Sequence, residues 1–394
     1  MRLPPPLKVP CTALTHLGMT SSTAPDRDLQ RKAGDYARLR RGWWFARLVT
    51  GGIYTLAWLT LGWGVSLKQS AVPYIVDDRV LIGVVGGVFG LGYYMTGLPI
   101  SYCSGYVLSH YFRLSNQTIS SWISDQVKSL GLGALFIVFL LEVTYYLLRA
   151  LPDLWWLGTG AILLLLSVIL TNLGPLIIFP IFYRVVPLGD EHADLSSRLT
   201  RLAEHAGTKV RGVYKFDMSR RTKAANAALM GLANTRRIVL SDTLLSSFSS
   251  DEIETILGHE LGHHVHKDIP LGIVVRSVIT LGGLYLTSLS MGSGVTMLQL
   301  ESVSDVAGIP WLVLVFGTYQ IATMPLEHAY SRWRERSADK HALHLTGKGS
   351  AYASALVRLA DQNLAEAYPE RWVELMLYSH PALGKRIAMA EAYG

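Results

Sequence analysis

Two histidines four residues apart, with a glutamate directly after the first, are the residues of this chain best suited to carry out chemistry. They are His259, Glu260 and His263. Four residues are about one turn of an α-helix, so both imidazole rings would project from the same face. Two neutral imidazoles on one face can bind Zn²⁺, and a neighbouring carboxylate can act as a base toward water that the metal activates. The spacing is therefore typical of the metal-binding helix of a zinc metallopeptidase.

The surrounding residues favour a helix and offer further ligands. Ser249 and Glu252 have the spacing of a capping box, and apolar residues follow at helical intervals. Catalytic zinc usually has three protein ligands and one open position, so two histidines leave the site incomplete. Glu335 could be the third ligand, and Asp339, four residues later, could accept a hydrogen bond from a ligand histidine. On spacing alone, a solvent-exposed charged face is the simpler interpretation, because arginines flank both carboxylates.

The elements that must position these residues belong to a membrane protein. Half of the 394 residues are hydrophobic, 16% are charged and the mean hydropathy is +0.29, whereas about a quarter of the residues of a soluble protein are charged. Six windows are long enough to cross a bilayer, which takes about 20 residues, and Glu142 is the one charged residue within them. The windows are 48–67, 80–109, 129–148, 154–183, 277–300 and 306–326. They favour a polytopic membrane protein over a soluble protein with buried helices.

Lysine and arginine in the loops predict the orientation of these spans. Residues 1–47 carry nine Lys and Arg against three acidic residues, and residues 331–394 carry nine Lys and Arg. Residues 301–305 carry two acids and no base, as expected outside the cell. Six crossings then place both termini and the metal-binding helix on the cytoplasmic side, and the expected location is a bacterial plasma membrane. The net charge of +7 suits an anionic lipid surface better than nucleic acid, because no stripe of basic and aromatic residues is present.

The pattern divides the chain into five regions. These are a basic, partly disordered cytoplasmic tail (1–47), four transmembrane helices (48–183), a cytoplasmic catalytic region (184–268), two transmembrane helices (269–326) and a C-terminal catalytic region (327–394). Periodicity within them predicts helices at 193–206 and 349–365 and strands at 210–217 and 237–241. Charges at membrane windows usually face a bundle interior, and Glu142 could pair with Arg276 there.

These motifs together resemble a known family. The segments 259–263 and 331–339 are similar to those of integral-membrane zinc metallopeptidases of the CAAX prenyl protease type 1 family and of their bacterial heat-shock-linked relatives. Segments 111–128, 226–245 and 379–387 are also similar, so the resemblance covers about residues 48–394. It implies a mainly α fold, with about six transmembrane helices enclosing a chamber and a zincin-like cytoplasmic catalytic domain that carries a small β element. Eukaryotic members have seven membrane helices, whereas six are expected here.

The resemblance implies roles for the residues of the metal centre. His259, His263 and Glu335 would bind Zn²⁺, and Asp339 would fix the orientation of a ligand histidine. Glu260 would take a proton from the attacking water and pass it to the leaving amine.

It also implies roles for residues outside the metal centre. His380 would donate a hydrogen bond to the oxyanion of the reaction, with Arg386 supporting it. Asn226 and Ala227 would hold an extended peptide, as in strand addition. The structural alternatives are a helix cap for His380, a surface ion pair for Arg386 and a turn for Asn226.

The leading interpretation is thus a zinc-dependent endopeptidase that acts on membrane proteins or membrane-associated peptides, prenylated peptides among them. A catalytically inactive scaffold is less consistent with the intact pair of Glu260 and Glu335. A transporter should show paired internal repeats, and the sequence has none. The expected partners are a peptide or membrane-protein substrate and the lipid bilayer, and the sequence carries no signal for an oligomeric state.

Overall fold

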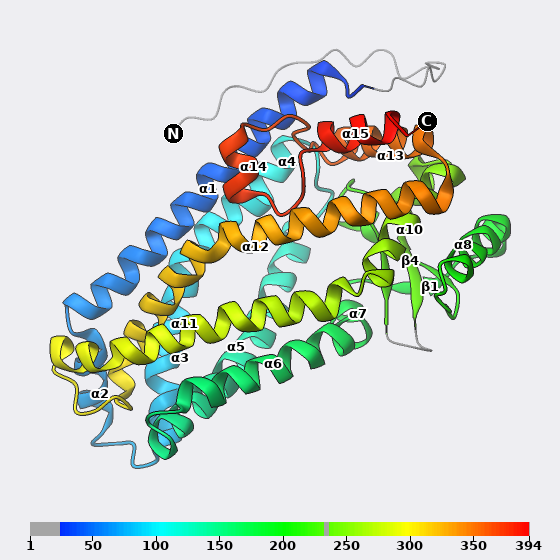
Figure 1. Ribbon diagram of the computed structural model, residues 1–394. Coiled ribbons are helices and arrows are strands. Elements are labelled where there is room, and N and C mark those ends of the chain that lie inside the picture. Colours follow the sequence, from blue (N-terminus) through cyan, green and yellow to red (C-terminus); the bar gives the residue numbers. More distant parts are fainter. Residues whose placement is uncertain (1–23, 232–235, 394) are drawn as a thin grey trace.

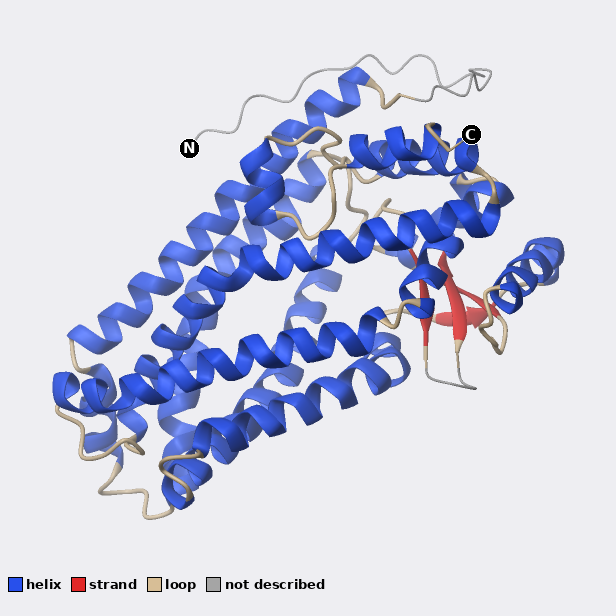
Figure 2. Cartoon of the chain, viewed as in Figure 1, coloured by secondary structure: helices blue, strands red, loops and turns tan. Residues whose placement is uncertain are grey.

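The computed structural model describes residues 24–231 and 236–393 of the chain. Within them, long helices run side by side and make up most of the molecule, and a small sheet lies at one end (Figure 1; Figure 2). The predicted disorder at the start of the basic tail falls on residues 1–23, outside the described residues.

The apolar helices form the membrane part. They are α1 (Arg27–Thr60), α2 (Trp63–Ala71), α3 (Asp78–Ser101), α5 (Ile119–Ala150), α6 (Trp155–Leu173), α11 (Asp268–Leu298) and α12 (Ile309–Thr346). π-Helical turns extend α3 into α4 (Leu108–Tyr111) and α6 into α7 (Phe179–Phe182). Five of the resulting helices could cross a bilayer, and α1 and α2, bent by 60°, make a sixth if they form one span. The six predicted windows all fall on these helices.

Two predicted region boundaries are not boundaries between elements. Helix α1 begins at Arg27, well before the predicted span at residue 48, because the Asp26 side chain caps its first turn. Lysine and arginine are good helix formers, so charge marks the edge of the membrane rather than the end of the helix. The window 48–67 is instead broken at Gly62, whose φ of 65° suits glycine. Helix α12 likewise runs unbroken through residue 327 and carries Glu335 on the C-terminal extension of a membrane helix.

The predicted catalytic part, called the catalytic part below, combines a four-stranded sheet with short helices. The sheet order is β1 (Val185–Pro187), β2 (Val213–Phe216), β4 (Arg237–Ser241) and β3 (Ala227–Met230), and only β2 and β4 are parallel. The helices are α8 (Ala193–His205), α9 (Asp242–Ser247), α10 (Ser250–Val265), α13 (Gly349–Gln362), α14 (Arg371–Leu377) and α15 (Leu383–Glu391). The predicted helices and strands of this part are confirmed, whereas β1 and β3 were not predicted.

Helix α10 is the central element of the catalytic part. Its capping box is formed as predicted, with Ser249 and Glu252 bonding each other's backbone. Its apolar side packs into the core against α8 and the sheet through side chains that are nearly fully buried, among them Leu199, Ile238, Leu257 and Leu261.

Small residues let α10 approach α12 closely. A Cβ atom on Gly262 would lie 2.9 Å from the Ala338 Cα atom, and one on Gly258 would lie 3.3 Å from the Ala342 Cα atom. Side chains at these positions would push the two helices apart. This contact brings the segment that carries Glu335 against the segment that carries the two histidines, so it determines the geometry of the site.

A charged network also ties α10 to its neighbours, and it yields a prediction about stability. Glu254 is buried and accepts hydrogen bonds from Arg198 of α8 (2.6 Å) and from Lys348 at the start of α13. Burial alone would raise the pKa of Glu254, but these cations outweigh it and lower the pKa. We expect Glu254→Gln to destabilise the folded state by ~1–2 kcal/mol at neutral pH.

The sign of the pH dependence follows from the lowered pKa. The carboxylate contributes stability above its unfolded pKa of about 4.3, and this contribution is lost as the pH falls through the lower folded value. The difference in unfolding temperature between wild type and Glu254→Gln, measured in detergent, should therefore shrink below about pH 4. A difference that stays constant down to pH 3 would exclude a role of the ionised carboxylate.

Candidate active site

The three predicted metal ligands lie together, although they come from different helices. Ligand atoms of His259, His263 and Glu335 all lie within 4.8 Å of one another. The Nε2 atoms of the two histidines are 3.1 Å apart, and each lies 3.3–3.4 Å from a carboxylate oxygen of Glu335. Two imidazole nitrogens and a carboxylate are a ligand set that Zn²⁺ commonly takes.

The electrostatics of the site suit a divalent cation. Burial lowers the pKa of His259, but the nearby carboxylates of Asp339 and Glu335 outweigh burial and raise its pKa to about 9. The Oε2 atom of Glu335 is buried and accepts no hydrogen bond in the described part of the chain. Both observations indicate an excess of negative potential at the point where the ligand atoms converge. Since a bound cation would relieve it, the residues present fit a metal.

Asp339 lies against the second ring nitrogen of His259. Its Oδ1 atom lies 2.8 Å from His259 Nδ1, and the carboxylate is fully buried. Arg386 donates to both of its oxygens, at 2.6 and 2.9 Å, and the Tyr352 hydroxyl donates at 2.5 Å. With its Nδ1–H donated to Asp339, His259 presents the Nε2 lone pair to the metal position.

Two residues of the site, Tyr352 and Asp268, were not predicted from the sequence. Tyr352 lies on α13, and no sequence pattern links this helix to the candidate ligands. Asp268 Oδ2 lies 2.7 Å from His263 Nδ1. Asp268 can thus accept a hydrogen bond from His263, as Asp339 can from His259. Lys267 has a left-handed φ of 54°, and this turn brings Asp268 back against the helix that it follows. An acidic residue five positions after His263 was the available signal, but the turn cannot be read from the sequence.

His380 lies in the loop after α14 and is close to the candidate metal ligand Glu335. Its Nε2 atom lies 3.3 Å from Glu335 Oε1, and its Nδ1 atom lies 2.9 Å from the Ser379 hydroxyl. Partial desolvation lowers the pKa of His380, which favours the neutral ring, although 60% of the side chain is exposed to solvent. If Ser379 donates to Nδ1, then Nε2 carries the hydrogen and can donate toward the site. Among the described residues, no hydrogen bond joins Arg386 to His380. In the structure, Arg386 therefore supports Asp339 by hydrogen bonds and does not support His380.

Glu260 lies where two cavities meet. One cavity of about 550 Å³ and another of about 730 Å³ both have Glu260 and Glu335 in their walls. Burial raises the pKa of Glu260 and outweighs the nearby His259, His263 and Arg386, which lower it. A half-buried carboxylate beside the metal ligands is suitably placed to exchange a proton with a reacting water.

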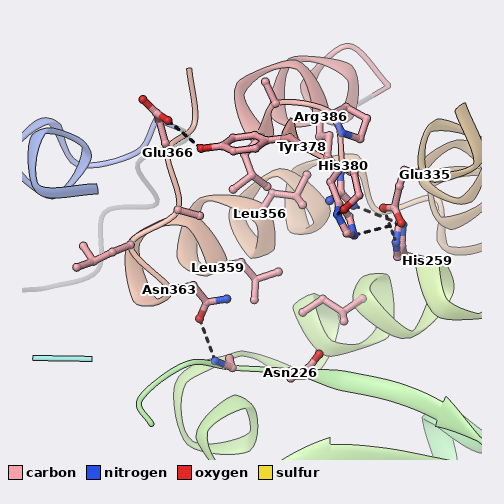
Figure 3. Close-up of a pocket in the computed structure, with 18 of the residues that line it drawn as sticks. Asn226, His259, Glu335, Leu356, Leu359, Asn363, Glu366, Tyr378, His380 and Arg386 are labelled. Atoms are coloured by element: carbon pink, nitrogen blue, oxygen red, sulfur yellow. Dashed lines mark hydrogen bonds and ion pairs between the residues drawn. The ribbon is translucent and has the colours of Figure 1, made fainter. Parts of the chain in front are cut away.

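The smaller cavity lies within the catalytic part and is walled by α1, α10, α13 and the His380 loop. Figure 3 shows the candidate metal ligands His259 and Glu335 beside His380 and Arg386, and Asn226 and Asn363 lie further along the cavity. Asn226 is exposed and precedes β3, an edge strand that, among the described residues, pairs only with β4. Ala227, the first residue of β3, is buried but also lines the cavity. The predicted peptide-binding residues are thus in the same cavity as the metal ligands.

The larger cavity lies between the membrane helices α6, α11 and α12. Polar atoms of Gln320 and Tyr330 in its wall are buried without a hydrogen-bond partner in the part of the chain that the structure describes. Arg276 pairs there with Glu327 (3.9 Å) rather than with Glu142, because Glu327 faces it from the adjacent helix. The cavity is therefore mixed in character. More than half of its lining residues are polar or charged, and the apolar ones are Leu163, Leu164, Ile269, Ile273, Val275 and Phe316.

Comparison with known proteins agrees with this site. Residues 190–393 match peptidase family M48, and residues 21–184 match the family described as CAAX prenyl protease N-terminal, five membrane helices. The chain is 32% identical over 339 residues to the uncharacterized metalloprotease YhfN of Bacillus subtilis (strain 168), covering 83% of this chain and 78% of the relative. It is 26% identical over 383 residues to the probable CAAX prenyl protease 1 of Schizosaccharomyces pombe, covering 92% and 79%.

The fold is shared with a solved structure of the same kind. The crystal structure of S. mikatae Ste24p superposes with a TM-score of 0.83 over 94% of this chain and 92% of that chain, at 22% sequence identity. The predicted fold class, a helical membrane bundle with a small catalytic domain, is confirmed. The scaffold and transporter alternatives are not favoured. The chain belongs to peptidase family M48 and is an integral, multi-pass membrane metallopeptidase of the CAAX prenyl protease 1 type.

Proposed function

We propose that this protein is a zinc endopeptidase that cleaves membrane-associated peptides, including peptides anchored by a prenyl group. The observation that carries the proposal is the meeting at Glu260 and Glu335 of two cavities, one in the catalytic part and one between membrane helices. A peptide chain in the cavity of the catalytic part and an apolar anchor in the cavity between membrane helices would bring the bond between them to the metal ligands. Relatives named CAAX prenyl protease 1 support the choice of a prenylated substrate.

We infer the following roles for the chain's own residues. His259, His263 and Glu335 would hold Zn²⁺, which when bound supplies a Lewis acid for the scissile carbonyl and for water. Glu260 takes a proton from the attacking water and delivers it to the leaving amine. The edge of β3, starting at Ala227, binds the extended peptide backbone by strand addition.

The test is cleavage of a matched pair of synthetic peptides by the purified protein in liposomes. One peptide carries a farnesyl group on a cysteine near its C-terminus, and the other carries the unmodified cysteine. We expect the farnesylated peptide to be cleaved with the higher kcat/KM, because its anchor occupies the cavity between α6, α11 and α12. Equal cleavage of both peptides would retain the endopeptidase but remove the prenyl group from the proposal. Peptides trapped by a Glu260→Gln variant, identified by mass spectrometry, would then give the substrate class.

His380 is expected to stabilise the oxyanion that forms during hydrolysis. Its Nε2–H can donate into the site from a loop that Pro381 restricts, which preorganises the donor. We predict that His380→Ala lowers kcat by about a hundredfold or more while zinc content and KM stay close to wild type. Steady-state kinetics with parallel metal analysis will measure this. A variant that loses zinc but keeps normal turnover per bound metal would make His380 a structural residue.

We also propose that the active site faces the cytoplasm of a bacterial cell. The loop charges support this orientation. It places three of the five predicted regions, 1–47, 184–268 and 327–394, on the cytoplasmic side. Single cysteines at the exposed positions Lys32, Ser247 and Ser302, in a background without Cys11 and Cys103, will test it with a membrane-impermeant thiol reagent. In sealed cells, only the cysteine at position 302 should be labelled. Labelling at position 247 from outside would invert the topology.

A further inference from the structure

We propose that Asp268 is a positioning residue for the metal ligand His263, held in place by Arg334, and that it ties the metal site to the membrane helix α11. This inference rests on the proposed zinc site. It assigns a role to two residues that the ligand motifs do not include.

The contact geometry is that of a fixed hydrogen-bonded chain. Asp268 Oδ2 lies 2.7 Å from His263 Nδ1, and Arg334 Nε donates to Asp268 Oδ1 at 2.5 Å. A second Arg334 nitrogen donates to the His266 carbonyl oxygen at 3.0 Å. The side chains of Asp268 and Arg334 are only 10% and 12% exposed. Each oxygen of Asp268 thus has its own partner, and water has little access to compete for either.

This chain determines which nitrogen His263 offers to the metal. A carboxylate accepts hydrogen bonds only, so the His263 Nδ1 atom beside it must carry the hydrogen. The Nε2 atom then presents its lone pair toward His259 Nε2 and Glu335 Oε1, at 3.1 and 3.3 Å. Without the carboxylate, the ring could rotate or adopt the other tautomer, and metal binding would have to restore the order.

Asp268 and Asp339 form two equivalent supports around one site. Asp339 bonds His259 and is backed by Arg386, whereas Asp268 bonds His263 and is backed by Arg334. With Glu260 and Glu335, the site holds four carboxylates against two guanidinium groups. The two negative charges that remain match one divalent cation.

The support joins three elements at one point. His263 belongs to α10, Asp268 is the first residue of the membrane helix α11, and Arg334 directly precedes the ligand Glu335 on α12. A shift of α11 in the bilayer would therefore move the carboxylate that orients His263. This connection predicts that zinc affinity depends on the packing of a membrane helix and not only on the catalytic part.

The test compares the zinc dissociation constants of full-length variants by competition with a chromogenic chelator. Asp268→Asn should bind Zn²⁺ about 10- to 100-fold more weakly than wild type, the usual loss for an outer partner of a ligand histidine. Asp268→Glu, which keeps the carboxylate, should recover part of the affinity. The matched control is Asp125→Asn, because Asp125 also forms a half-buried pair with an arginine (Arg221, 2.8 Å) but lies outside the site. Its zinc affinity should stay within about threefold of wild type.

A zinc affinity of Asp268→Asn within about threefold of wild type would overturn the inference. If Asp268→Asn does not fold, Arg334→Gln decides, since it removes the group that holds Asp268 in place while Asp268 and His263 themselves are unchanged. A weaker zinc affinity in that variant supports the role, and an unchanged affinity overturns it. Failure of the proposed function gives a different result, because the wild type itself would then bind no zinc or cleave no peptide.

Discussion

Replacement of Glu260 by glutamine is expected to abolish peptide cleavage while the metal and the fold remain. The amide keeps the size and the polarity of the side chain but cannot accept a proton at neutral pH. Because Glu260 borders both cavities beside the metal ligands, it is the carboxylate placed to receive the proton of the attacking water. Loss of a general base typically costs about 10²- to 10⁴-fold in rate. We therefore expect kcat to fall by at least two orders of magnitude.

The design of this experiment separates catalysis from stability. Zinc content and the unfolding temperature of Glu260→Gln should match those of wild type, since Glu260 is not a ligand in this arrangement. Glu254→Gln, on the same helix, is the matched control. It should lower the unfolding temperature but leave the turnover of folded enzyme unchanged. Turnover of Glu260→Gln near the wild-type level would require another base.

Replacement of Glu335 by alanine is expected to remove the metal and with it all activity. The Glu335 carboxylate faces both ligand histidines, and one of its oxygens has no hydrogen-bond partner among the described residues. Without it, two imidazoles remain, which is fewer than the three ligands of a catalytic zinc site. Metal analysis of the purified variant should show a small fraction of the zinc found in wild type. His259→Ala and His263→Ala should behave in the same way.

Glu327 provides the control for this prediction. It lies on the same helix, pairs with Arg276 and has no contact with the ligand histidines in the described structure. Glu327→Gln should therefore keep the wild-type zinc content. A Glu335→Ala variant with the wild-type zinc content would remove Glu335 from the ligand set.

The parts of the site that follow a helical period could be predicted from the sequence. His259 and His263 share one face of α10, as Glu335 and Asp339 share one face of α12, because residues four apart on a helix always do. The capping box at Ser249 is equally local. That these two faces meet follows from the resemblance to a known family. In the structure, glycines on α10 make the close approach to α12 possible.

The remaining parts depend on the folded chain. Asp268 reaches His263 only because Lys267 adopts a left-handed conformation, which no local pattern indicates. Tyr352 reaches Asp339 only because α13 packs against α10. The start of α1 was misplaced because the apolar window shows where a helix can enter the membrane, not where it begins. Tertiary contacts, rather than periodicity, thus determine the supports around the metal ligands.

The most direct test of a zinc-dependent membrane peptidase is a cycle of metal removal and return on one preparation in liposomes. Cleavage of the farnesylated peptide should disappear when a chelator removes the metal and should return when about one equivalent of Zn²⁺ per chain is added. Glu260→Gln should bind the same Zn²⁺ without recovering cleavage. Cleavage by wild type that persists after complete metal removal, or recovery in Glu260→Gln, would contradict the mechanism proposed for this site.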